Sequence, residues 1–202
     1  MKKIILALVL ILGLAPFSFA QDADLLIDGF EVAISGGPEG TVDFGAGNGS
    51  SVEVRAATDI KQEGNQSIKV TYDALPGGYI FVARGFGLDA KNAGWVVGNK
   101  EIDWNKYKGI SFYMYGNDSK TKIAFDLKDN GAELWRNIIE DNFRGWKKIN
   151  CPFSEFFVRG DWQPDAADKN AIMDFPLRNY QIEPLPPAKG TLYFDQVELV
   201  KK

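Results

Sequence analysis

The feature that most limits the fold of this chain is a succession of short segments in which apolar and polar residues alternate. In residues 109–115, for example, Ile110, Phe112 and Met114 are separated by polar or amphipathic side chains. A period of two residues is typical of a β-strand with one buried face, because successive side chains point to opposite faces. The pattern recurs along the chain and predicts strands over residues 25–32, 52–57, 67–73, 79–84, 109–115, 122–128, 133–139, 146–152 and 191–200.

Turn-forming residues separate these segments, as in Gly36-Gly37-Pro38 and Asp129-Asn130-Gly131. Residues of these types favour the tight turns that join neighbouring antiparallel strands. No long amphipathic helix is visible; residues 154–157 predict a short helical turn, and the proline-rich residues 184–187 predict a surface connection. The pattern therefore predicts an all-β fold in a single domain, an antiparallel β-sandwich of the jelly-roll kind.

The first 20 residues have the composition of a secretory signal peptide. Lys2 and Lys3 precede an apolar run over residues 4–14, and small residues stand before the cleavage position at Ala20. The run is shorter than the ~20 residues that a membrane-spanning helix needs. We therefore expect cleavage after Ala20, a mature domain of residues 21–202, and a secreted or periplasmic location with no membrane attachment after cleavage.

The chain contains no histidine and a single cysteine, Cys151, and these two facts exclude several kinds of site. Ser-His-Asp and Cys-His catalytic sites are impossible without histidine, and the commonest zinc ligand is missing. One cysteine cannot form an internal disulfide, so the core must stabilise the domain. The formal net charge is −4, and −6 once the two signal-peptide lysines are removed. With no long basic run, nucleic acid is not an expected partner.

Seven segments of the chain form an ordered set of motifs. They are Leu-Ile-Asp-Gly-Phe-Glu at 26–31, Gly-Asn-Gln-Ser-Ile-Lys-Val at 64–70, Asp-Trp-Asn-Lys-Tyr-Lys-Gly-Ile-Ser-Phe at 103–112, Trp-Lys-Lys-Ile at 146–149, Pro-Phe-Ser-Glu-Phe at 152–156, Arg-Gly-Asp-Trp-Gln-Pro at 159–164 and Gly-Thr-Leu-Tyr-Phe-Asp-Gln-Val-Glu-Leu at 190–199. Taken together and in this order, they resemble the family-11 carbohydrate-binding modules, which are jelly-roll domains. The similarity spans nearly all of residues 25–200, and a weaker similarity exists to the complex-I intermediate-associated-protein-like sandwiches.

This resemblance implies non-catalytic binding of a β-1,4- or mixed-linked β-glucan on a concave sheet face. Tyr79, Arg159 and Trp162 match a tyrosine, an arginine and an aromatic position of the family's sugar-contacting set. The family's histidine contacts are absent, with Leu134 at one of these positions, and residues 182–185 hold no aromatic where a further tyrosine is expected. The resemblance therefore implies that the binding face is only partly retained.

The residues themselves also favour a sugar-binding surface, because aromatic rings stack on pyranose faces while charged planar groups bind hydroxyls. Side chains that alternate with the predicted core positions should point away from the core. Each aromatic also has the alternative of packing structurally, since aromatics are favoured in strands for packing alone. The predicted surface, grouped as if on one sheet, consists of Tyr79, Tyr113, Tyr115 and Asp126, with Arg159, Asp161 and Trp162 at its rim.

The resemblance further implies a structural calcium ion near the two ends of the domain. Asp28 and Glu31 lie on the first predicted strand and Asp195 on the last. Calcium takes carboxylate and carbonyl oxygens, and backbone oxygens of residues 64–66 would complete the set. The alternative is that these acids cap strands or pair with lysines.

Two other functions remain open at this point. A glycoside hydrolase would need two opposed carboxylates, for which Asp126, Asp129, Glu133 and Asp161 are available. A protein-interaction or assembly module would use the sandwich face for protein contact. The leading hypothesis is a polysaccharide-binding protein that acts alone or beside glycoside hydrolases.

Overall fold

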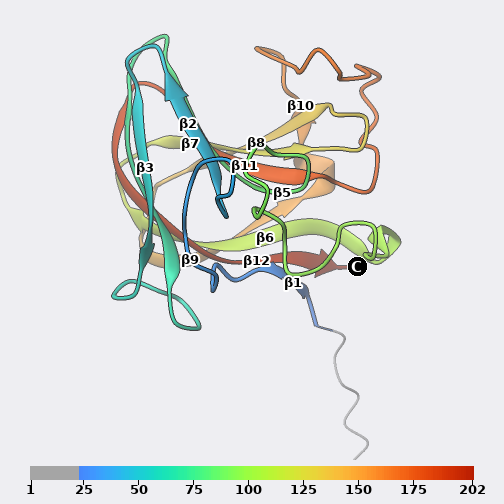
Figure 1. The fold of residues 1–202 in the computed structure, drawn as a ribbon, viewed down its shortest axis with the longest axis horizontal. Coiled ribbons are helices and arrows are strands. Elements are labelled where there is room, and N and C mark those ends of the chain that lie inside the picture. Colours follow the sequence, from blue (N-terminus) through green and yellow to red (C-terminus); the bar gives the residue numbers. More distant parts are fainter. Residues whose placement is uncertain (1–22) are drawn as a thin grey trace, which may run out of the picture.

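The computed structural model describes residues 23–202, so the predicted signal peptide lies outside the described residues (Figure 1). Within the described part, no helix is long and apolar enough to cross a membrane. The elements are β1 (Leu25–Asp28), β2 (Asp43–Gly47), β3 (Ser51–Ala57), β4 (Ser67–Ala74), β5 (Tyr79–Gly85), the 3-10 helix η1 (Trp104–Lys106), β6 (Tyr107–Asn117), β7 (Lys122–Lys128), β8 (Leu134–Glu140), β9 (Arg144–Pro152), the 3-10 helix η2 (Phe153–Glu155), β10 (Phe157–Val158), β11 (Asn179–Pro184) and β12 (Ala188–Lys201).

The strands form two antiparallel sheets that face each other (Figure 1). The first sheet has the order β3-β4-β12-β6-β9, and β1 also pairs with β12. The second sheet has the order β10-β8-β7-β11-β5-β2. All pairings are antiparallel, which confirms the predicted all-β antiparallel sandwich in a single domain.

The core lies between the sheets and is built by the alternation seen in the sequence. Phe112 on β6 and Phe125 on β7 are buried, and their ring centroids lie 4.6 Å apart, so they join the two sheets directly. Phe125 stacks in turn on Tyr180 of β11 at 5.6 Å. Trp95 also stacks on Tyr180, at 6.2 Å, so these rings form one aromatic column in the core.

One ion pair is buried in this core beside the aromatic column. Arg84 Nε donates to Asp28 Oδ2 at 2.6 Å and Nη2 donates to Oδ1 at 2.9 Å, and Arg84 is only 2% exposed. The Tyr180 hydroxyl donates to Asp28 Oδ2 at 2.8 Å. Burial, with the nearby negative charge of Asp28, raises the pKa of Tyr180 well above its ordinary value, so this hydroxyl stays a donor. Asp28 therefore stabilises the core by accepting hydrogen bonds from side chains of β5 and β11.

The alternation rule misses three strands of the second sheet, β2, β11 and the two-residue β10, and it places the ends of some other strands wrongly. In β2 the sequence Asp-Phe-Gly-Ala-Gly resembles a turn, because glycines hold alternate positions. β11 alternates over a few residues only and runs into the prolines that predicted a loop. β1 ends at Asp28 rather than at residue 32, because Phe30 adopts a φ of 56°, which breaks the extended backbone.

Candidate functional site

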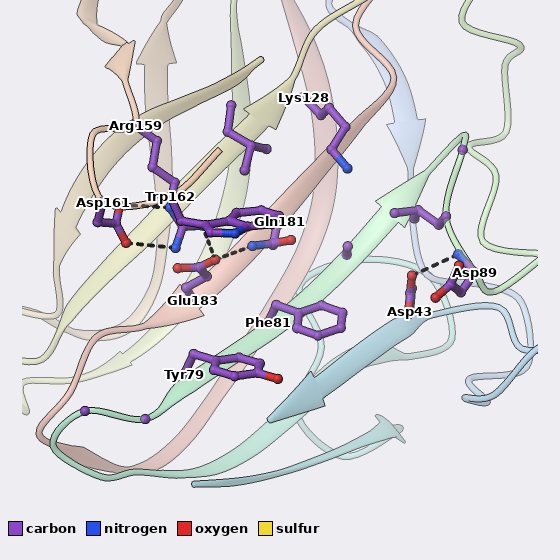
Figure 2. Close-up of a pocket in the computed structure, with 16 residues that line it drawn as sticks. Asp43, Tyr79, Phe81, Asp89, Lys128, Arg159, Asp161, Trp162, Gln181 and Glu183 are labelled. Carbon is purple, nitrogen blue, oxygen red and sulfur yellow. Dashed lines mark hydrogen bonds and ion pairs between the residues drawn. The ribbon is translucent and has the colours of Figure 1, made fainter. Parts of the chain in front are cut away.

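The outer face of the second sheet carries a cleft of about 670 Å³ (Figure 2). Its floor comes from outward positions of neighbouring strands, because directly paired residues point to the same face. Strand register places one such row across the sheet, formed by Asp43, Ala83, Gln181, Asp126 and Arg136. The lining residues are Asp43, Gly77, Gly78, Tyr79, Phe81, Ala83, Gly87, Leu88, Asp89, Lys128, Leu134, Arg159, Asp161, Trp162, Gln181 and Glu183.

Two aromatic side chains of β5 form part of the cleft floor. Tyr79 and Phe81 alternate with Ile80 and Val82, which are buried in the core. The alternation therefore directs Tyr79 and Phe81 outward, and Figure 2 shows both rings in the cleft, reaching toward β2. Tyr79 is 52% exposed, so its ring is available to a ligand.

A third aromatic ring, Trp162, faces the cleft from the loop that follows β10. It is 57% exposed, and the Arg159 guanidinium carbon lies 5.7 Å from its ring centroid. Gln163 anchors this loop to β8: its side-chain N–H donates to the carbonyls of Leu134 and Arg159, both at 2.9 Å. Its side-chain oxygen accepts from the Leu134 N–H at 2.7 Å. Gln163 therefore holds the rim in place, a role the sequence did not reveal.

Beside Trp162, five charged side chains form a continuous network along one wall. Arg136 binds both oxygens of Asp126, at 2.8 and 2.7 Å, and Glu183 Oε2 at 2.6 Å. Arg159 Nη1 donates to Glu183 Oε1 at 2.7 Å and to Asp126 Oδ2 at 3.1 Å. Its Nε and Nη2 donate to the two carboxylate oxygens of Asp161, at 2.9 and 3.0 Å. The Arg159 guanidinium lowers the pKa of Asp161, which stays ionised at the cleft surface.

The opposite side of the cleft carries carboxylates and one amine. Asp43 and Asp89 lie together, with the Asp89 N–H donating to Asp43 Oδ2 at 3.1 Å (Figure 2). Lys128 also lines the cleft, and burial with the nearby Arg178 lowers its pKa. Within residues 23–202, the acidic groups that line the cleft outnumber the basic ones, which disfavours a polyanionic ligand.

The structure brings together most of the residues that the sequence predicted for a sugar-binding surface. Tyr79, Arg159, Asp161 and Trp162 line the cleft, and Asp126 lies directly beneath, bound to both arginines. Sequence reasoning missed Gln181 and Glu183, because β11 was not predicted. Their alternation with buried Tyr180 and Ile182 was the available signal.

The expectation that Tyr113 and Tyr115 share this surface is wrong, because β6 belongs to the first sheet. Both side chains point away from the core, as predicted, but on the opposite outer face of the sandwich. There Tyr115 packs edge-to-face between Trp146 at 5.5 Å and Tyr193 at 5.8 Å. The two-residue period tells which side chains point outward but not which sheet a strand joins.

The three predicted calcium ligands do not form one oxygen-lined site. Both oxygens of Asp28 face Arg84 and Tyr180 in the core, which corrects its expected role. Glu31 accepts from the backbone and side-chain N–H groups of Asn65, and Asp195 Oδ2 accepts from the backbone of residues 62 and 63. Within residues 23–202, no three His, Cys, Asp or Glu side chains gather into a metal-binding group.

A side-chain amide also takes carbonyl oxygens that an ion would need. Gln66 Nε2 donates to the carbonyls of Phe30 at 2.6 Å and Val32 at 2.7 Å. N–H donors thus surround the acids, so the residues present do not fit a calcium ion.

We therefore expect removal of calcium with EDTA to leave the melting temperature unchanged. The measurement is thermal unfolding of the mature protein with EDTA and with excess calcium. A fall in EDTA that calcium restores would show instead that Glu31 and Asp195 rearrange around an ion.

The cleft has the chemistry of a surface that binds sugar rings. Exposed aromatic faces can stack on the C–H face of a pyranose, and the arginine–carboxylate edges can bind its hydroxyls. Three of the four carboxylates considered for hydrolysis serve structural contacts instead, and only Asp161 lines the cleft. Asp126 is held by two arginines, Asp129 accepts from the Trp135 indole N–H at 3.0 Å, and Glu133 accepts from the backbone of residue 171.

Known proteins share this fold. A family-11 carbohydrate-binding module from Clostridium thermocellum, solved in complex with a β-1,3-1,4-mixed-linked tetrasaccharide, matches with a TM-score of 0.70 and 22% identity over 88% of this chain and 95% of that one. The family-11 module of the cellulosomal cellulase Lic26A-Cel5E, from the same organism, matches with a TM-score of 0.67 and 20% identity over 89% and 95%. These likenesses support the jelly-roll fold.

Sequence comparison extends this likeness. Endoglucanase H of Acetivibrio thermocellus is 29% identical over 144 residues, which is 67% of this chain but only 14% of that enzyme. Residues 15–202 match the family described as "Carbohydrate binding domain (family 11)". The chain therefore belongs to family 11 of the carbohydrate-binding domains.

Proposed function

We propose that the cleft on the second sheet binds a β-glucan chain, either β-1,4-linked or mixed-linked. The observation that carries the proposal is the pair of exposed rings, Tyr79 and Trp162, that line one cleft with the Arg159–Asp161 pair. A family-11 module of the same fold was solved with a mixed-linked tetrasaccharide, which supports this ligand class.

In this proposal, the aromatic rings contact the faces of the sugar rings and the charged network contacts their hydroxyls. Tyr79, Phe81 and Trp162 supply apolar faces for sugar stacking. Asp161, Glu183 and their arginine partners present charged groups that are already fixed by ion pairs, so little side-chain entropy is lost on binding. The excess of carboxylates in the lining favours a neutral glycan over an acidic one.

The test uses residues 21–202 with soluble mixed-linked β-glucan, a β-1,4-linked oligosaccharide and an anionic polygalacturonate. We expect titration calorimetry to show binding to one or both β-glucans and none to the polyanion. A reducing-sugar assay on the same mixtures should show no release of sugar. Absence of binding to both glucans would overturn the ligand, and sugar release would overturn non-catalytic binding.

We further propose that this domain is exported and works beside a glucan-degrading enzyme. The likeness to a segment of Endoglucanase H supports the association, although the chain spans only 14% of that enzyme. The apolar run after Lys2 and Lys3 supports export. N-terminal sequencing of the exported protein should begin at Gln21, and an N-terminus still at residue 1 would contradict cleavage.

A further inference from the structure

We propose that Gly45 and Gly47 on edge strand β2 are positioning residues for the aromatic floor of the cleft. Their effect on affinity depends on the proposed glucan binding, but their effect on ring position does not. In strand register, Gly45 pairs with Phe81 and Gly47 pairs with Tyr79. Each glycine therefore lies directly beside an outward aromatic ring of β5.

The space above both glycines is filled by these rings. A Cβ atom at position 47 would lie 2.5 Å from Tyr79 Cζ and 2.7 Å from its hydroxyl oxygen. A Cβ at position 45 would lie 2.8 Å from Phe81 Cε1 and 3.1 Å from its Cζ. Carbon atoms make contact at about 3.5–4.0 Å, so neither ring could keep its place beside a side chain at these positions.

Backbone conformation does not explain these glycines. Neither Gly45 nor Gly47 has a positive φ, so other residues could adopt the same backbone. Glycine also weakens the interior of a strand, because it loses more conformational entropy than other residues and offers no side chain to pack. The feature that requires glycine here is the close approach of the two rings.

The rings of Tyr79 and Phe81 therefore extend the floor of the cleft from β5 over the edge strand β2. Tyr79 is 52% exposed, yet one side of its ring rests on the backbone of β2 (Figure 2). A ring supported in this way is held before the ligand arrives, which reduces the side-chain entropy lost on binding. Gly45 and Gly47 thus contribute to affinity without contacting the sugar.

The decisive substitution is Gly47→Ala, whose methyl group would displace the Tyr79 ring. We expect β-glucan affinity to fall about tenfold, part of the loss that removing the ring itself would cause. In a Tyr79→Ala background, the same substitution should change affinity less than twofold, because the ring it displaces is already gone. Equal losses in both backgrounds would overturn the positioning role.

Gly36→Ala is the matched control. A Cβ at Gly36 would lie 2.5 Å from the ring of Phe44, which alternates with the glycines of β2 and packs against the core rather than the cleft. Gly36 precedes β2, so this substitution creates the same kind of steric conflict against a ring of β2 that lies outside the cleft. Thermal stability should fall in both variants, while glucan affinity should fall only in Gly47→Ala.

A measurement without ligand keeps the inference independent of the proposed function. An aromatic ring above an α-carbon shifts its proton resonances upfield in NMR spectra. We expect the Gly47 α-protons to move downfield in Tyr79→Ala, and the Gly45 α-protons in Phe81→Ala. Unchanged resonances would overturn the ring placement, whereas changed resonances in a protein that binds no glucan would reject only the proposed ligand.

Discussion

Replacing Asp28 with alanine is expected to lower the free energy of unfolding by about 3–5 kcal/mol, the usual cost of breaking a buried ion pair. The substitution removes the partner of two Arg84 donors and of the Tyr180 hydroxyl, and all three side chains are 2% exposed or less. A charged guanidinium would then be left in the core without its partner. Urea denaturation of the wild type and the variant measures the change.

Two further variants separate the lost charge pairing from lost packing. Tyr180→Phe removes one hydroxyl and keeps the ring, so we expect a loss of about 1 kcal/mol. Asp28→Ala combined with Arg84→Met leaves no unpaired charge, so it should recover part of the stability lost in Asp28→Ala. A loss below about 1 kcal/mol in Asp28→Ala itself would contradict a structural role for the pair.

The second large effect is expected on ligand binding. Trp162→Ala and Tyr79→Ala should each weaken β-glucan binding by about 1–3 kcal/mol, or about 5–150-fold, because each removes an aromatic anchor. Their side chains are 57% and 52% exposed, so the fold should persist. Calorimetric titration with mixed-linked β-glucan, together with a circular dichroism spectrum, measures both quantities.

Tyr113→Ala provides the matched control for this prediction. It removes the same side chain from the outer face of the first sheet, where Lys148 Nζ lies 5.9 Å from the ring centroid. Glucan affinity should not change in this variant. Unchanged affinity in Trp162→Ala and Tyr79→Ala, or a loss in Tyr113→Ala, would mean that the binding face has been assigned to the wrong sheet.

The candidate site shows where sequence reasoning succeeds and where it stops. Tyr79, Arg159 and Trp162 could be named in advance, because local alternation and a loop motif mark them as outward residues. Glu183 was missed, because β11 alternates over only a few residues and ends in prolines. In the sequence, Gly45 and Gly47 resemble turn residues, and the reason for glycine at these positions is seen only where β2 pairs with β5.

The sequence by itself determined that this chain forms a β-sandwich, because the two-residue period and the turn residues are local properties that need no partner strand. It also excluded histidine-dependent catalysis. Only the tertiary structure decided which outward side chains meet: Tyr79 and Trp162 share one cleft, whereas Tyr113 lies on the opposite face. The same holds for Asp28, whose role depends on Arg84 from another strand. Contacts between strands distant in sequence depend on sheet order, which no local pattern encodes.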